Sequence, residues 1–308
     1  MNRPKSHRPR SAAPELHTPG DWLAWAVTEY ESHELALGQI SDNAHDEVLY
    51  LILHTLELPM DSEPDVLERV LSPEQKKLLK KIFRRRILDH VPASYLTQEA
   101  WLGEHRFYCD ERVLTPRSYF LELIPTLPSY LPKGLPVRDV VDVCTGSGCL
   151  AVLLAYQYGG AQVDAVELSP DALAVAKINV KEHKMEDRIT LHESDVFDAV
   201  PERRYDIILS NPPYEPSEVC DNLPSEFKHE PRMALDGGAD GLVIVRKLLQ
   251  QSVSRLHPHG IIVLEVGAQR TAMQNAWPRL PMRWLKTLDG MNCVCLIRAE
   301  DLAKQFGN

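Results

Sequence analysis

Residues 142–151 read DVCTGSGCLA, a glycine-rich turn between a predicted strand and a predicted helix. β-Branched residues just before the turn indicate the strand, and small and aliphatic residues after it indicate the helix. Glycine at 146 permits a tight turn, and glycine at 148 has no Cβ that would keep a ligand away from the backbone. Free N–H groups at the start of the helix favour a carboxylate or a phosphate. The stretch therefore predicts a ligand site where the first strand ends.

Short β-branched runs alternate with helical segments downstream of Val140, which is the pattern of a parallel sheet covered by helices. We predict an α/β fold, a Rossmann-like domain over residues 119–308 with a seven-stranded, mostly parallel sheet. The expected strands are residues 140–144, 162–168, 189–194, 205–211, 260–266, 284–287 and 293–297.

Residues 21–95 predict a smaller helical domain that selects the substrate. Asp21 is expected to cap the first helix, and a second helix is expected near Asp46. The third helix is expected from Pro73 to about Asp89, because residues 72–75, SPEQ, combine an N-cap, a first-turn proline and a residue that can complete a capping box.

Basic residues recur at i, i+4 spacing on this third helix, while Leu79, Ile82, Phe83 and Ile87 are left to pack inward. The two basic rows are Lys76, Lys80 and Arg84, and Lys77, Lys81 and Arg85. Either these residues form a solvated face, or the basic helix 76–86 contacts ribosomal RNA or the substrate.

The segments that flank the helical domain have different patterns. Residues 1–20 hold several Pro and Arg and few hydrophobic residues, which predicts a flexible tail. Residues 102–115 alternate apolar and polar side chains, with Asp110-Glu111 as the expected turn. We therefore expect a β-hairpin in a linker over residues 96–118.

The overall charge helps to exclude some partners. A formal charge of −10 argues against binding mainly by neutralising phosphates, since that mode needs a surplus of Lys and Arg. Residues 11–68 contain thirteen Asp and Glu and no Lys or Arg, which indicates either a solvated acidic face or a surface for a basic protein. No apolar run reaches the roughly 18 residues of a membrane-spanning helix. The six cysteines show no paired CxxC spacing, so we expect no metal site and reduced thiols in the cytoplasm.

Acidic residues follow the second and third predicted strands. Glu167 ends the second strand, where an acidic side chain typically accepts both hydroxyls of a ribose. NAD and S-adenosylmethionine both contain that ribose, so Glu167 and the glycine turn leave both cofactors open. Asp195, in Ser194-Asp195-Val196, is placed to accept from an adenine amino group, with a plain loop cap as the alternative.

The fourth predicted strand is followed by Asn211-Pro212-Pro213-Tyr214, at the edge where open α/β sheets bind ligands. Two prolines fix φ and remove two N–H groups, which leaves carbonyls free on a rigid loop. The Asn211 side-chain carbonyl and the Pro212 backbone carbonyl can accept the two hydrogens of a planar NH2 group, and Tyr214 can pack on its π-face. An amide nitrogen is a poor nucleophile, so we expect geometry rather than a strong base to drive its reaction. The alternative is an ordinary Pro-Pro turn.

These features together resemble the class I methyltransferases with an NPPY motif, and among them the protein-glutamine N5-methyltransferases. The resemblance covers roughly residues 22–297 and includes FYCDERVLTPRS at 107–118, HEP at 229–231 and DGGADGL at 236–242. The segments SYFLELI at 118–124 and PASYLTQEAW at 92–101 are similar to the branch that modifies ribosomal protein uL3. Thr115 replaces a more usual aliphatic residue, and Glu167 stands where many relatives carry Asp.

The resemblance implies methyl transfer from S-adenosyl-L-methionine, with S-adenosyl-L-homocysteine as product, to the side-chain amide of a glutamine in large-subunit ribosomal protein uL3. It implies that the acceptor amide meets Asn211, Pro212, Pro213 and Tyr214. It also implies that the cofactor is held by Asp142, Thr145, Gly146, Ser147, Gly148, Glu167, Asp195, Val196 and Asn211.

Other functions remain open from the residues alone. The related branch that acts on peptide release factors usually continues the Pro-Arg pair differently. An amino-methyltransferase of DNA or RNA would meet the same planar NH2 group on adenine or cytosine, but the acidic charge disfavours a nucleic-acid backbone. An NAD-dependent oxidoreductase would leave residues 211–214 unexplained. A non-catalytic binding module fits less well still.

Overall fold

Residues 15–307 are described by the structure, a computed structural model, and they fall into two units that divide between Thr97 and Gln98. Residues 1–14 of the predicted tail lie outside the described residues, whereas Pro19 and Gly20 belong to the first helix. Residues 98–118 of the predicted linker are grouped with the second unit. Among the described helices, none has the length and apolar character needed to span a membrane.

The first unit consists of short helices around one core. They are α1 (Pro19–Ser32), α2 (Ala44–Thr55), the 3-10 helix η1 (Pro64–Glu68), α3 (Pro73–Ile87) and α4 (Ala93–Thr97). As the i, i+4 spacing predicts, Leu79, Phe83 and Ile87 of α3 are buried in this core, and Ile82 packs at its edge. The Trp22 ring of α1 stacks on Phe83, with 5.9 Å between the ring centres.

Helix starts follow the capping rules, with one correction. At α3 the Ser72 hydroxyl accepts from the Gln75 N–H at 3.2 Å, and the Gln75 side chain accepts from the Ser72 N–H at 3.1 Å. This confirms the predicted capping box. At α1 the predicted cap is wrong: the N-cap is Thr18, and Asp21 completes its capping box by accepting from the Thr18 N–H at 2.9 Å. Proline at the first helical position lets α1 begin before Asp21.

Arg86 is buried, in contrast to the other basic residues of α3. Its Nε donates to the Glu47 carboxylate at 2.7 Å, its Nη2 donates to the Ala36 carbonyl at 3.0 Å, and its guanidinium lies 5.2 Å from the centre of the Tyr30 ring. The predicted basic face over residues 76–86 therefore does not include Arg86, which serves the core of the first unit.

The second unit is built on a seven-stranded sheet with the order β5-β4-β3-β6-β7-β9-β8. β3 to β7 pair in parallel, and β9 is antiparallel to both of its neighbours. This confirms the predicted α/β fold and the predicted strands, although β7 begins earlier than expected. The strands are β3 (Asp139–Val143), β4 (Gln162–Glu167), β5 (Ile189–Glu193), β6 (Tyr205–Ser210), β7 (Leu256–Glu265), β8 (Arg283–Leu285) and β9 (Val294–Arg298).

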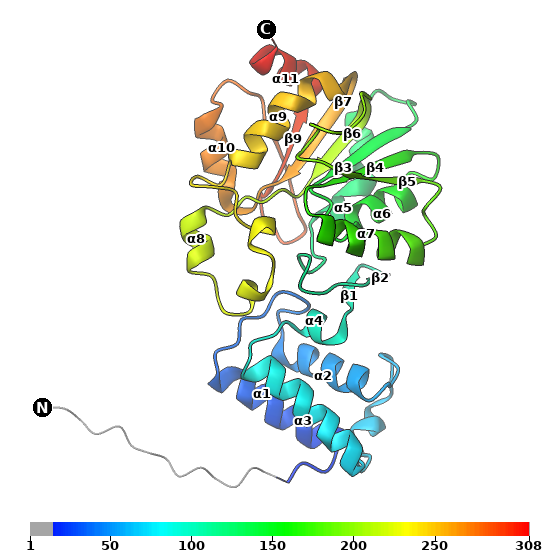
Figure 1. Ribbon diagram of the computed structural model, residues 1–308, viewed down its shortest axis with the longest axis vertical. Coiled ribbons are helices and arrows are strands. Elements are labelled where there is room, and N and C mark those ends of the chain that lie inside the picture. Colours follow the sequence, from blue (N-terminus) through cyan, green and yellow to red (C-terminus); the bar gives the residue numbers. More distant parts are fainter. Residues whose placement is uncertain (1–14, 308) are drawn as a thin grey trace, which may run out of the picture. The chain divides into compact units, whose positions relative to one another are not determined.

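Helices cover both faces of this sheet (Figure 1). Successive strand residues alternate between two cores: Ile207 and Leu209 belong to one, and Ile208 belongs to the other. One face is covered by α5 (Phe120–Leu123), η2 (Ile124–Tyr130), α6 (Cys149–Gln157) and α7 (Pro170–Glu182), and the other by α9 (Val243–Arg255), α10 (Arg270–Ala276) and α11 (Ala299–Phe306). Burial on both faces explains the nearly continuous hydrophobic runs in the central strands.

A two-stranded hairpin precedes this sheet, but its turn is not where we predicted it. β1 (Ala100–Leu102) pairs with β2 (His105–Phe107), and Gly103 and Glu104 form the turn. Gly103 has φ +64°, which a residue without a Cβ adopts at low cost. A turn is present at Asp110-Glu111, where the Val113 N–H donates to the Asp110 carbonyl at 3.1 Å, but it does not connect the two strands of the hairpin, so that part of the prediction is wrong. The Asp110 side chain accepts hydrogen bonds from the Arg112 side chain and from the Tyr108 hydroxyl.

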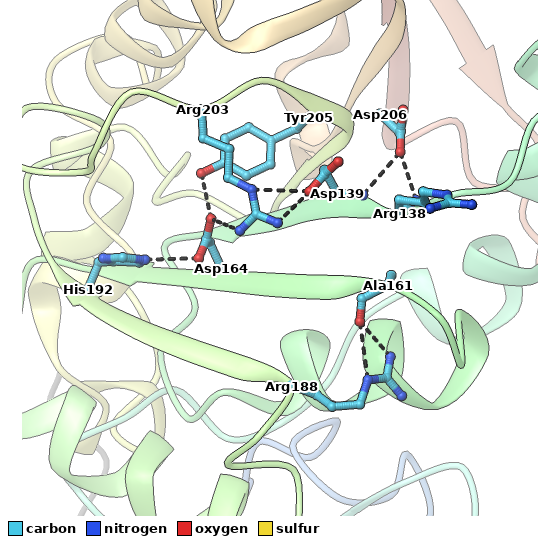
Figure 2. A network of polar contacts seen from close by, with 9 residues as sticks. All are labelled: Arg138, Asp139, Ala161, Asp164, Arg188, His192, Arg203, Tyr205 and Asp206. Atoms are coloured by element: carbon cyan, nitrogen blue, oxygen red, sulfur yellow. Dashed lines mark hydrogen bonds and ion pairs between the residues drawn. The ribbon is translucent and has the colours of Figure 1, made fainter.

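A polar network ties β3, β4, β5 and β6 together (Figure 2). The Arg203 guanidinium pairs with Asp139 and Asp164, and Asp164 also accepts from the Tyr205 hydroxyl at 2.8 Å. His192 contacts the other oxygen of Asp164 at 3.0 Å. These bonds fix the strands relative to one another, and the carboxyl ends of β3, β4 and β6 are left to form a site.

Candidate active site

A cavity lies at the carboxyl ends of β3, β4 and β6, where the strands lead into loops. Parallel sheets covered by helices bind ligands at this edge, because the loops that follow neighbouring strands diverge there. Six of the predicted site residues line the cavity: Gly146, Glu167, Asp195, Val196, Asn211 and Pro213. The structure thus brings together residues that are up to 67 positions apart in the sequence.

The glycine turn after β3 has left-handed backbone at three positions, with φ +63° at Cys144, +53° at Gly146 and +77° at Gly148. A Cβ added at Gly146 would meet no atom within 4 Å, so this residue presents open backbone to the cavity. A Cβ at Gly148 would lie 3.1 Å from the Ala176 Cβ on α7. The expectation that Gly148 admits a ligand is therefore corrected, because this glycine admits a neighbouring helix.

Asp142, Thr145 and Ser147 lie behind the turn and do not line the cavity. The fully buried Asp142 carboxylate accepts from the Thr145 hydroxyl at 2.5 Å. Burial raises the pKa of Asp142 to about 7, against the lowering effect of the Thr145 hydrogen bond. The Ser147 carbonyl accepts from the Asn179 side chain at 2.8 Å, which connects the turn to α7. These residues hold the shape of the turn.

Glu167 joins the glycine turn to the loop that follows β4. One carboxylate oxygen accepts from the Gly146 N–H at 2.9 Å, and the other accepts from the N–H groups of Leu168 at 2.8 Å and Ser169 at 3.0 Å. An ionised carboxylate has about four acceptor positions. Glu167 therefore retains capacity for a ligand hydroxyl on the side that faces the cavity.

Asp195 and Val196 form the cavity wall after β5. The Asp195 carboxylate pairs with the Lys247 ammonium at 2.8 Å, and 46% of its side chain is exposed. Val196 has φ +53°, an outlier for a β-branched residue. Strained backbone of this kind is concentrated at binding and catalytic sites. Its presence in the cavity wall supports a ligand-binding role for this loop.

The loop 211–214 continues from β6 into the same cavity. Asn211 and Pro213 line the wall, whereas Pro212 is buried behind them. Among residues 15–307, no N–H or O–H group donates to the Asn211 side-chain oxygen or to the Pro212 carbonyl. The Asn211 oxygen thus remains without a donor from these residues at the cavity wall, whereas the Pro212 carbonyl, also without such a donor, belongs to a buried residue behind that wall.

Tyr214 is placed differently from the prediction that it packs on the ligand. It is not among the residues that line the cavity, and its ring lies against Gly267 of the 3-10 helix η5 (Gly267–Gln269). A Cβ at Gly267 would lie 2.5 Å from Tyr214 Cε2. Burial raises the pKa of the Tyr214 hydroxyl well above its ordinary value, so the ring stays neutral. In this structure Tyr214 supports the loop from behind.

Sequence reasoning missed the residues that surround this loop. Glu265, at the end of β7, is buried beside Asn211 and accepts from the Ser118 hydroxyl at 2.5 Å. Arg117 forms two hydrogen bonds with the buried Glu230 carboxylate, at 2.6 and 2.8 Å. A signal for Glu265 existed in the sequence, because it stands at the carboxyl end of a predicted strand.

Segment 230–236 forms another part of the wall, through Pro231, Met233 and Ala234 around the 3-10 helix η4 (Arg232–Ala234). It follows the short helices α8 (Ser217–Asp221) and η3 (Phe227–His229). Apolar side chains on this wall suit a flat, partly apolar ligand. Among the described residues no group of His, Cys, Asp and Glu is arranged to hold a metal ion.

Comparison with known proteins places this chain in a family. The model of the methyltransferase small domain matches residues 123–259. The ribosomal protein uL3 glutamine methyltransferase of Neisseria gonorrhoeae is 44% identical over 292 residues, which is 94% of this chain and 97% of that protein. The protein of the same name from Burkholderia pseudomallei is 43% identical over 295 residues, with 93% and 96% coverage. The one from Bordetella pertussis is 43% identical over 290 residues.

Solved structures agree on the fold. The hMettl16 catalytic domain in complex with hairpin 6 of the MAT2A 3′UTR superposes with a TM-score of 0.51, at 16% identity, over 75% of this chain and 84% of that one. At this level of identity the likeness concerns the fold alone.

Proposed function

Because this chain belongs to the family of ribosomal protein uL3 glutamine methyltransferases, we propose that it methylates the side-chain amide nitrogen of a glutamine in uL3. A bond forms between this nitrogen and the methyl carbon as the bond from that carbon to the sulfur of S-adenosyl-L-methionine breaks. One amide proton leaves to solvent, and the products are S-adenosyl-L-homocysteine and N5-methylglutamine.

The observation that carries this proposal is the pair of acceptors at Asn211 and Pro212. The planar NH2 group of glutamine has two hydrogens, and the loop offers two oxygens that receive no hydrogen bond from residues 15–307. Hydrogen bonds to both hydrogens hold the nitrogen in one orientation. They also strengthen as positive charge develops on the nitrogen, which lowers the barrier to transfer.

The cavity fits S-adenosyl-L-methionine in residue type and placement. Open backbone at Gly146 would receive the amino-acid end, the Glu167 carboxylate would accept from the ribose, and Asp195 would accept from the adenine amino group. Apolar residues on segment 230–236 would exclude water. The bound cofactor supplies a methyl group activated by the positive charge on sulfur, so the chain needs no strong base of its own.

Alternative substrates are separated by one assay. Tritiated S-adenosyl-L-methionine is offered to the protein with free uL3, with a peptide release factor and with total RNA in separate reactions. The proposal expects label in uL3 alone, located by mass spectrometry on a glutamine. Label in the release factor or in RNA, without label in uL3, contradicts it.

We propose in addition that α3 contacts ribosomal RNA while uL3 is being modified. Five exposed cations on this helix form no ion pair with a carboxylate among residues 15–307: Lys77, Lys80, Lys81, Arg84 and Arg85. Cations that neutralise RNA phosphates release the counterions held at those phosphates. The affinity of the protein for RNA is therefore higher at low salt. This surface is suited to RNA, whereas the acidic remainder of the unit is not.

The RNA contact predicts a difference between two forms of the substrate. Replacing Lys80, Lys81 and Arg84 by Gln is expected to weaken binding to uL3 that carries a ribosomal RNA fragment and to leave binding to free uL3 unchanged. Exposed lysines of the second unit, Lys133, Lys181 and Lys184, provide a charge-matched control. Equal binding of both forms by the α3 variant would remove RNA from the proposal.

A further inference from the structure

Glu265 stands next to Asn211 because of the sheet register. Ser210 of β6 pairs with Leu264 of β7, so the residues that follow each of them lie side by side at the carboxyl edge. The Glu265 side chain is buried, and its Oε1 accepts from the Asn211 Nδ2 at 3.4 Å. Hydrogen bonds at catalytic sites are often long before the substrate is bound and shorten in the complex.

The second carboxylate oxygen is already occupied. Glu265 Oε2 accepts from the Ser118 hydroxyl at 2.5 Å and from the Tyr119 N–H at 3.1 Å. The Ser118 hydroxyl itself accepts from the Phe120 N–H at 3.0 Å, which directs its own proton toward Glu265. These donors hold the carboxylate so that Oε1 faces Asn211.

This geometry decides which end of the Asn211 amide faces the cavity. The oxygen and the nitrogen of an asparagine amide have nearly the same size, so packing alone does not distinguish its two orientations. A carboxylate only accepts hydrogen bonds, so the NH2 group of Asn211 must face Glu265. The Asn211 oxygen is thereby directed away from Glu265, toward the side on which the substrate amide would bind.

We propose that Glu265, held by Ser118, is a positioning residue that keeps the Asn211 oxygen toward the nitrogen that is methylated. The inference rests on the proposed function, because it takes Asn211 to bind the acceptor amide. It adds a residue on β7 and a residue before α5 to the set that makes the reaction possible.

Protonation of Glu265 reverses the arrangement. Oε2 already receives two donors, so an added proton resides on Oε1 and turns this oxygen into a donor. Asn211 then presents its oxygen to Glu265 and its NH2 group to the NH2 group of the substrate, which repel each other. Transfer is therefore expected to need ionised Glu265.

Several titratable groups face Glu265. Burial raises its pKa to about 7, while Ser118, Tyr119 and the Arg117 guanidinium act to lower it. Arg117 is itself paired with Glu230. The Tyr214 hydroxyl and the Cys293 thiol also lie near enough to interact with Glu265, and the pKa of each is raised mainly by burial, so both are neutral at pH 7.

The first test replaces Glu265 by Gln in the full chain. Ser118 and Tyr119 donate to the glutamine oxygen, so its NH2 group faces Asn211 and imitates protonated Glu265. With uL3 as substrate, kcat is expected to fall about 100-fold, the loss typical when one well-placed hydrogen-bonding group is removed. The dissociation constant of S-adenosyl-L-methionine and the KM for uL3 should change less than about threefold. Glu186→Gln on the exposed surface is the matched control.

The second test follows kcat against pH. The wild-type protein is expected to lose activity as pH falls through about 7, and Glu265→Gln should lack this acid limb. Ser118→Ala removes one donor to the carboxylate and should move the limb to higher pH. A residue with a merely structural role would not move the pH profile.

Outcomes separate the inference from the proposed function. A wild-type protein that labels no uL3 overturns the proposed function and this inference with it. An active wild type, together with unchanged kcat in Glu265→Gln, overturns the inference alone. An acid limb that does not move in Ser118→Ala overturns it too, and this variant remains decisive even where Glu265→Gln does not fold.

Discussion

The Gly146 N–H donates to the Glu167 carboxylate at 2.9 Å, so the glycine turn after β3 is fastened to the end of β4. The same carboxylate accepts from the two N–H groups that follow it in the chain. Glu167 therefore shapes the loops that follow β3 and β4, and it also lines the cavity. We propose that this side chain combines its structural role with a role in binding the cofactor.

Replacing Glu167 by Ala is expected to weaken S-adenosyl-L-methionine binding by about 1 to 3 kcal/mol, because ligand hydroxyls and the Gly146 N–H lose their acceptor. Affinity for uL3 should hardly change. Glu193, which pairs with Glu167 in the sheet register but is exposed and lies outside the cavity, is the matched control. Titration calorimetry measures both variants, and an unchanged dissociation constant for Glu167→Ala would remove Glu167 from the site.

Asn211→Ala is expected to abolish most of the transfer and to leave cofactor affinity within a few-fold. In the proposed function the asparagine oxygen accepts from the acceptor amide, and loss of one such group typically costs about 100-fold or more in rate. Single-turnover rates and calorimetry test the two parts. Asn222→Ala, on the exposed surface, controls for the substitution itself. Near wild-type turnover by Asn211→Ala would show that the loop orients the substrate by other groups.

The buried carboxyls predict an unusual dependence of stability on pH. Burial raises the pKa of Asp142 from 3.8, and of Glu265 from 4.5, to about 7 in the folded protein. Between about pH 4 and pH 7 the folded state therefore binds more protons than the unfolded state. Each group stabilises the fold fully below its unfolded pKa and loses this contribution as pH rises through about 7. Within this range each group lowers the free energy of unfolding by about 1.4 kcal/mol for each unit of pH increase.

Asp142→Asn removes one of these two contributions. Urea unfolding at pH 5.5 and pH 8 should show a free energy of unfolding that falls with pH by about 2 kcal/mol less in this variant than in the wild type. Glu186→Gln, which alters an exposed carboxyl, should follow the wild type. The same pH dependence in Asp142→Asn and the wild type would mean that Asp142 is ionised throughout this range.

The sheet could be predicted from the sequence because each strand is a local run of β-branched residues, and burial on both faces makes that run continuous. The rigidity of loop 211–214 and its lack of N–H donors could be predicted, because two prolines fix φ and remove two N–H groups whatever surrounds them. Gly148 was misread, since a glycine that admits a helix and one that admits a ligand look the same in sequence. Only the structure shows that Gly148 lies against Ala176 of α7.

Other features depend on partners far away in the chain. Glu265 meets Ser118 across 147 positions, and Arg86 meets Glu47 across 39 positions, so neither contact leaves a periodic signal. Charge on a helix face does not reveal which basic residue is buried. The hairpin turn was missed for a simpler reason: Gly103 was the better turn residue, and the acidic pair after it was preferred.

Acidic residues of the first unit are proposed to attract uL3, since ribosomal proteins are basic. Exposed carboxylates at Glu57, Asp61, Glu63 and Asp65 follow one another along η1 and the segment before it. Opposite charges on two partners raise the rate of encounter, and salt screens the effect beyond a Debye length of about 8 Å. The association rate with uL3 is therefore expected to fall several-fold as ionic strength rises to physiological values and above.

Replacing these four residues by their amides should lower the association rate at low salt and flatten its salt dependence, while turnover of a short glutamine peptide stays constant. Exposed carboxylates of the second unit, at Glu186, Asp187, Glu202 and Glu300, provide a control with the same change in net charge. Stopped-flow binding at several salt concentrations compares the two variants. If the association rate falls by the same factor in both variants, net charge alone attracts uL3. A salt-independent association rate in the wild type would show instead that recognition lies in short-range contacts of the catalytic unit, because salt screens any long-range electrostatic attraction.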